Sequence, residues 1–281
     1  MASITYDARS FQIDGRRIWL VSGAIQYARL PREAWAHRIH LAKLAGLNTI
    51  ETPVVWAEHE PRPGSFDFEG DRDLRHFVEL CGRAGMYVIL RPGPFVGSSF
   101  DLGGLPSWLP GAAEGIKLRG ASAPLLEACS RYLTAVAEQV RDLQVTSSGT
   151  GGPIILVQNE SHWTCGSEVE ANGYLGELHR YLRESGMTVP TINSNNLWQG
   201  MESEVAAWSG SEQMLATTRQ LSEVKPDQPR LVIDFSVTAQ SVLGEAAGSA
   251  PEPMAIQRRL AEILSGGGQF NIDPICGGSN F

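Results

Sequence analysis

The chain has 281 residues, of which 42% are hydrophobic, and its formal net charge is −8 at pH 7. This length and composition support a large buried core, and they suit one α/β barrel over residues 1–281 at least as well as two small domains. The acidic balance argues against a nucleic acid or an anionic membrane as a partner, because both polyanions are bound by clustered Lys and Arg.

Apolar runs of strand length alternate with amphipathic stretches of helix length along the chain. Strands are expected at Ile18–Ala24, Asn48–Val55, Tyr87–Arg91, Ile154–Gln158, Val189–Asn193, Val205–Trp208, Leu231–Phe235 and Phe270–Ile275. Helices are expected at Arg32–Ala45, Asp71–Ala84, Leu125–Leu143, Glu170–Glu184 and Glu252–Leu264. This alternation is typical of βα units around a parallel sheet, and eight such strands predict a (β/α)8 TIM barrel with its active site at the strands' carboxyl ends.

The two ends of the chain carry further expectations. The start, MASITYDARS, has no charged segment followed by an apolar one, and no apolar stretch is long enough to span a bilayer. We therefore expect a cytoplasmic protein with no membrane partner, although a removed leader would leave no trace. The last expected strand ends close to the terminus with no clear eighth helix, so either the barrel closes differently or the natural chain continues.

Polar and aromatic side chains gather where the expected strands end. Such a rim suits an oligosaccharide or glycoside, because hydroxyl groups need hydrogen-bond partners and the apolar face of a sugar ring stacks on Trp or Tyr. The residues expected to contact this substrate are Tyr27, Glu51, Trp56, Ser99, Asn159, Asn193 and Asp273. No metal or other cofactor is expected, because the four cysteines stand far apart and His59 has no second His nearby.

Two carboxylates at strand ends form the predicted catalytic pair. Glu160 follows the fourth strand in "VQNESHW", and Asp234 ends the seventh. Cleavage of a glycosidic bond needs one group to protonate the leaving oxygen and a carboxylate to attack or stabilise the anomeric carbon. The alternative is that both close loops or pair with Arg91 and Arg29. Arg91 itself is expected to form a structural ion pair with Glu51, because a buried Arg needs a carboxylate.

Several strings resemble the successive signatures of glycoside hydrolase family 35, the β-galactosidases. They are "FQIDGRRIWLVSGAIQYARLPREAW", "LAGLNTIETPVVWAEHEPRPGSFDFEGDRDL", "GMYVILRPGPF", "FDLGGLPSWL", "GGPIILVQNE" and "GGSNF", and they run in the family's order over nearly the whole chain. The resemblance implies a TIM barrel and retaining hydrolysis of a terminal β-galactose without a metal. It also implies an Asn-Glu acid/base on the fourth strand and a Glu nucleophile on the seventh.

The chain departs from this family pattern at the reacting positions. Asn159 and Glu160 fit the Asn-Glu pair if two residues are deleted from the usual V-Q-V-E-N-E-Y-G; without that gap, His162 falls on the catalytic position. Asp234 stands where the family has Glu and is shorter by roughly 1.5 Å. Because carboxyl groups about 5 to 5.5 Å apart retain and those about 6.5 to 9.5 Å apart invert, this change could disable the nucleophile or alter the stereochemistry.

The family's sugar contacts are also replaced. Pro53, Gly97 to Ser99, Gln26 and Asp273 stand where the family has Tyr, C-A-E, His and Tyr. The galactose site is therefore not preserved, whereas the scaffold strings match. Two hypotheses follow. The first is a glycoside hydrolase or transglycosidase acting on a β-linked terminal sugar that is galactose-like but not a simple β-galactoside. The second is a non-catalytic carbohydrate-binding protein on a degenerate barrel.

Overall fold

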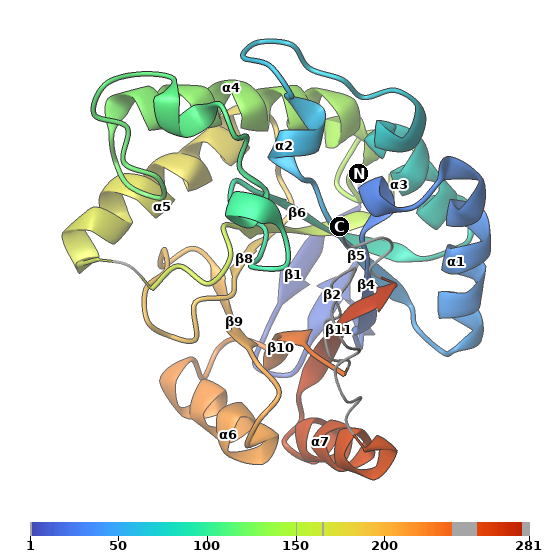
Figure 1. Cartoon of the computed structure of the whole chain (residues 1–281). Helices are drawn as coiled ribbons and strands as arrows, with labels where there is room; N and C mark the ends of the chain where they lie inside the picture. Colours follow the sequence, from blue (N-terminus) through green and yellow to red (C-terminus); the bar gives the residue numbers. More distant parts are fainter. Residues whose placement is uncertain (1, 150, 165, 238–251, 277–281) are drawn as a thin grey trace.

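The chain folds into a closed barrel of parallel strands (Figure 1), and the computed structural model describes residues 2–149, 151–164, 166–237 and 252–276. The barrel strands are β4 (Val21–Ile25), β5 (Thr49–Pro53), β6 (Tyr87–Gly93), β7 (Ile154–Asn159), β8 (Thr191–Asn193), β9 (Val205–Ser209), β10 (Leu231–Phe235) and β11 (Gln269–Cys276). Their order is β10-β11-β4-β5-β6-β7-β8-β9. The TIM barrel and all eight expected strands are confirmed. The final string "GGSNF", residues 277–281, lies outside the described residues.

Helices surround the barrel on its outer side (Figure 1). They are α1 (Arg32–Leu44), α2 (Trp56–His59), α3 (Leu74–Arg83), α4 (Ala123–Val140), α5 (Glu168–Glu184), α6 (Met214–Val224) and α7 (Pro253–Ser265). Short 3-10 segments are Tyr27–Arg29, Gly70–Arg72, Asp101–Gly104, Leu109–Gly111 and Arg141–Leu143. The five expected helices are present, and two more were not expected: α2, directly after β5, and α6, between β9 and β10. Within the described ranges, no helix is long and apolar enough to cross a membrane.

A small antiparallel sheet precedes the barrel and corrects one expected boundary. Its strands are β1 (Ile4–Tyr6), β2 (Phe11–Ile13) and β3 (Arg16–Ile18). Asp14 and Gly15 connect β2 to β3 with φ angles of 49° and 74°, which suits a tight hairpin turn. Ile18 pairs with Phe11 in this sheet, so the first barrel strand begins at Val21 and not at Ile18.

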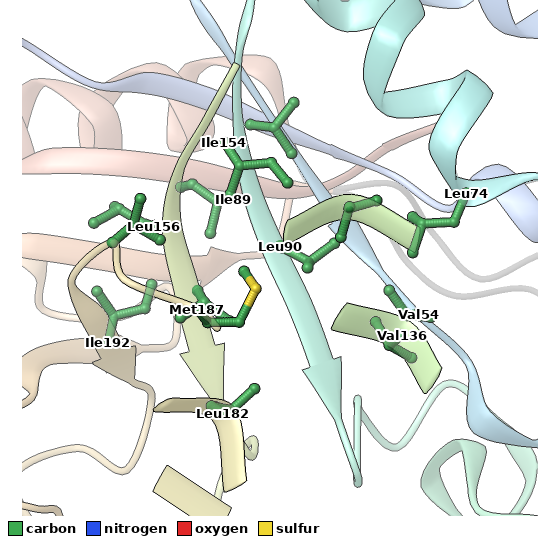
Figure 2. Packing of buried hydrophobic residues seen from close by; sticks show 14 of the residues in the cluster. Val54, Leu74, Ile89, Leu90, Val136, Ile154, Leu156, Leu182, Met187 and Ile192 are labelled. Carbon is green, nitrogen blue, oxygen red and sulfur yellow. The ribbon is translucent and has the colours of Figure 1, made fainter. Parts of the chain in front are cut away.

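The barrel wall is covered by apolar side chains on both faces. In Figure 2, Ile89 and Leu90 of β6 lie beside Ile154 and Leu156 of β7, with Val136 of α4 among the residues that cover them. All five side chains are almost completely buried. Strands covered on both faces read as continuous apolar runs, which is why the sequence pattern located them. The same packing fixes the positions from which the polar residues at the strand ends project.

Candidate active site

A buried arginine gathers three carboxylates at the mouth of the barrel. Arg91, on β6, lies 2.9 Å through Nε from Oε1 of Glu51 on β5. Its two terminal nitrogens lie 2.6 Å from Oδ1 of Asp234 on β10 and 2.9 Å from Oδ2 of Asp273 on β11. We call these four residues the Arg91 cluster. Glu51 and Arg91, which were expected to be partners, are in contact, and the structure brings three of the predicted site residues together around Arg91.

The cluster contains three carboxyl groups and one guanidinium group, and the carboxyl groups differ in protonation. Burial raises the pKa of Glu51 to about 8. Burial and the neighbouring charge of Asp234 also raise the pKa of Asp273, although Arg91 opposes this change. Burial acts on Asp234 too, but Arg91 and His162 outweigh it and hold the pKa of that carboxyl well below its ordinary value. Near neutral pH, Glu51 therefore carries a proton while Asp234 is ionised.

His162 lies against Asp234 on the open side of the cluster. Its Nε2 is 3.1 Å from Asp234 Oδ2, and its side chain is 42% exposed, whereas that of Asp234 is 9% exposed. Ser209 Oγ at the end of β9 is 3.1 Å from His162 Nδ1. Glu160, His162 and Asp234 all have left-handed φ angles, at 57°, 50° and 56°. Non-glycine residues rarely adopt this conformation, and strain of this kind concentrates at functional sites.

Glu160 is held apart from this arrangement. Its side chain is fully buried, and Oε2 accepts hydrogen bonds from Arg119 at 2.9 Å and from the Ser161 amide at 2.8 Å. Oε1 accepts one from the Tyr174 hydroxyl of α5 at 2.8 Å. Within the described part of the chain, no hydrogen bond or ion pair joins Glu160 to the Arg91 cluster. Glu160 is thus held by Arg119 and Tyr174, whereas His162 lies directly beside Asp234. The pairing of Glu160 with Asp234 stays a prediction.

Two aromatic residues expected to contact sugar are buried in the core. Tyr27 hydrogen-bonds to Nε2 of His59 at 2.5 Å and stacks on Phe77. Trp56 stacks on Tyr132, with ring centroids 4.6 Å apart. Each residue begins a short helical segment directly after a strand, and that turn packs the ring among the core residues. Both rings are completely buried, and their predicted sugar contacts stay predictions.

The other residues predicted to contact sugar lie either in the buried interior or at the barrel mouth. Asn159 and Asn193 are buried, and both donate hydrogen bonds to the carboxylate of Glu204, at 2.7 and 3.2 Å. Both amides thus support Glu204 in this structure, and their predicted sugar contacts stay predictions. Ser99 is half-buried, and its carbonyl oxygen accepts a hydrogen bond from an arginine. Asp273, whose side chain is 15% exposed, stays at the mouth beside the fully buried Glu51.

Comparison with known proteins identifies the ancestry of the barrel. The sequence pattern of the family "Glycosyl hydrolases family 35" matches residues 10–281. The chain belongs to glycoside hydrolase family 35. It is 33% identical over 279 residues to human "Beta-galactosidase-1-like protein 2", covering 97% of this chain and 43% of that protein. It is 32% identical over 290 residues to the "Beta-galactosidase" of Canis lupus familiaris, covering 99% and 42%. The chain thus spans less than half the length of these relatives.

Solved structures support the same fold. An exo-β-1,4-mannosidase from Opitutaceae bacterium strain TAV5 matches with a TM-score of 0.67 at 15% sequence identity, covering 97% of this chain and 53% of that one. At this identity the likeness shows the barrel architecture alone. The family 35 assignment therefore rests on the sequence match, and the shape agrees with it.

Within this family 35 barrel, the sequence indicated some site residues and missed others. His162 was indicated by the ungapped reading of "VQNESHW", which places it on the family's catalytic position. Arg119 was missed. It has a left-handed φ of 56°, its guanidinium lies 3.9 Å above the Phe95 ring, and it binds Glu160 from 41 positions upstream. The only signal for it was indirect, because a buried carboxylate such as Glu160 requires a charged partner.

Proposed function

We propose that this family 35 barrel binds and hydrolyses a β-linked terminal sugar that is galactose-like but not a simple β-galactoside, with Asp234 at the anomeric carbon. One observation carries the proposal. Asp234 is an ionised carboxylate at the barrel mouth, with Oδ1 held 2.6 Å from Arg91 and Oδ2 facing the exposed imidazole of His162. A fixed negative charge in this position can attack, or stabilise, the anomeric carbon as positive charge develops there.

The second reacting group in this proposal is His162 in place of Glu160. An imidazole nitrogen can donate a proton to the leaving oxygen, which is the task that a carboxylic acid performs in most glycosidases. Because the anomeric carbon must lie between the two groups, the 3.1 Å contact of His162 with Asp234 has to open when substrate binds. Reacting groups in retaining glycosidases stand about 5 to 5.5 Å apart. The 42% exposure of His162 lets its side chain swing outward without loss of core packing.

Turnover of aryl β-glycosides tests the proposal. The panel comprises the galactoside, glucoside, fucoside, arabinoside and xyloside, assayed with the native protein and with Asp234→Asn. We expect at least one glycoside to be cleaved and its turnover to fall about 100-fold or more in Asp234→Asn, because the charge at the anomeric carbon is removed. Asp227→Asn, at an exposed position, serves as the control. Equal turnover by the native protein and Asp234→Asn would contradict the proposal.

A binding function without catalysis is the second candidate. Both carboxylates of the sequence-predicted pair are held by arginines, Glu160 by Arg119 and Asp234 by Arg91. A protein that only binds sugar needs no free carboxylate at the anomeric carbon. Measurable binding of a panel sugar by calorimetry, together with no cleavage of any panel member, would favour this candidate over hydrolysis.

A further inference from the structure

A pocket of about 400 Å³ lies beside the proposed site, between the end of β9 and α6. Its volume falls in the range of small-molecule sites, which is about 300 to 1,000 Å³. None of the residues expected from the sequence to contact sugar lines it. The pocket is therefore separate from the Arg91 cluster, and the class of ligand that suits it is inferred from its own lining residues.

Ser209 connects this pocket to the proposed reacting groups. Ser209 lines the pocket, and its hydroxyl lies 3.1 Å from Nδ1 of His162. The other ring nitrogen of His162 contacts Asp234. Ser209 Oγ also lies 3.5 Å from this second nitrogen, so the wall of the pocket adjoins both ring nitrogens of His162. A leaving group that receives its proton from His162 lies beside this ring, and a leaving group large enough to extend past Ser209 reaches the pocket.

The walls of the pocket match a neutral sugar. Trp208 is half-buried, and within the described ranges its indole nitrogen forms no hydrogen bond, so it can donate to a ligand. A Cβ at Gly210 would lie 3.6 Å from this nitrogen, so the glycine leaves that edge of the indole uncovered. Thr217 and Gln220 add hydroxyl and amide groups. An aromatic ring among uncharged hydrogen-bonding groups suits a pyranose, which has an apolar face and a hydroxyl rim.

The charge of the lining narrows the ligand class further. Glu212 is the acidic residue on the wall, and no Lys, Arg or His is among the lining residues. Arg259 of α7 already pairs with this carboxylate, so a phosphorylated or carboxylated sugar would meet an acidic group whose neighbouring cation is engaged. Anions of that kind are normally bound through Arg or Lys. The pocket therefore favours an uncharged glycosyl unit.

We propose that the pocket between β9 and α6 is the subsite for a neutral sugar on the leaving-group side of the scissile bond. The role of this pocket in turnover rests on the proposed function. The binding of a sugar in the pocket does not depend on it. In this arrangement the terminal sugar occupies the barrel mouth beside Asp234, and the next glycosyl unit occupies the pocket. The natural substrate is then a glycoside whose leaving group is itself a sugar.

A site-specific titration tests the pocket. The protein has seven tryptophans, and the indole N–H signal of Trp208 can be assigned in a tryptophan-labelled NMR spectrum by comparison with Trp208→Phe. D-glucose, D-galactose and N-acetyl-D-glucosamine are then titrated into the native protein and two variants. Ala216→Trp fills the pocket from an exposed position on α6, and Arg219→Trp places the same ring on that helix outside the lining.

At least one sugar is expected to shift the Trp208 signal in the native protein and in Arg219→Trp, with at least about tenfold weaker binding in Ala216→Trp. The inference is overturned if no sugar moves this signal, or if Ala216→Trp binds as tightly as Arg219→Trp. Because the signal reports on the pocket alone, absent turnover with an intact shift would count against the proposed function and not against the subsite.

Discussion

Glu51 holds a proton in the folded protein that it releases in the unfolded chain. Burial raises its pKa from 4.5 to about 8, so between these values only the folded state keeps the proton. The free energy of unfolding is therefore highest below the lower value and falls as pH rises toward the upper one. The slope from this group is at most about 1.4 kcal/mol per pH unit. The raised pKa of Asp273 acts in the same direction.

Glu51→Gln is expected to flatten this pH dependence, because glutamine resembles the protonated acid and does not titrate. Urea unfolding from about pH 5 to about pH 8 measures it, with Glu33→Gln at an exposed position on α1 as the matched control. The native protein and Glu33→Gln should lose stability across this range, and Glu51→Gln should lose less. Parallel curves for all three proteins would show that Glu51 is ionised throughout.

At the scale of single residues, the sequence predicted which residues lie at the strand ends better than it predicted where their side chains point. Glu51, Asp234 and Asp273 were expected at the mouth because parallel strands of a barrel bring their carboxyl ends together. Glu160 was also placed at a strand end, correctly, but its side chain points to Tyr174 and Arg119. That direction depends on a left-handed backbone and on an arginine far away in the sequence, neither of which leaves a local pattern.

The contact between the first and last barrel strands closes the fold. Gly23 of β4 faces β11 so closely that an added Cβ would lie 2.7 Å from Cγ2 of Ile275 and 2.8 Å from Cδ1 of Leu47. Gly23→Ala is expected to destabilise the protein by about 1 to 3 kcal/mol, because the packed neighbours must move. Gly111→Ala, where no atom lies within 4 Å, is the control. Equal urea midpoints for the two variants would contradict this account of closure.

At the scale of elements, buried strands were the most predictable feature. Their continuous apolar runs follow from coverage on both faces, and that pattern is local. The start of the first barrel strand was misplaced because Ile18 has the apolar character of a strand residue but pairs in the small N-terminal sheet. The sequence pattern did not predict α6, because the buried residues of this helix include Thr217 and Thr218, which weaken its apolar stripe.

At the scale of the whole barrel, the two proposed reacting groups come from different strands that converge on the mouth. The Arg91 cluster comes from β5, β6, β10 and β11, which lie around β4 in the barrel order. His162 follows β7, and Ser209 ends β9, the strand that pairs with β10. A sugar bound over the mouth would thus meet both the ionised Asp234 and the imidazole. The assignment of these two roles to Asp234 and His162 is the central claim of the mechanism.

Dependence on the leaving group tests this claim most directly. Dinitrophenol departs without a proton and phenol needs one, so kcat/KM is compared for the two glycosides of whichever sugar the barrel cleaves. If His162 is the proton donor, His162→Gln should lower kcat/KM for the phenyl glycoside by about 100- to 10,000-fold and change that for the dinitrophenyl glycoside far less. Glu160→Gln should affect both glycosides alike. The opposite pattern, with the selective loss in Glu160→Gln, would contradict the assignment of His162 and restore Glu160 as the acid.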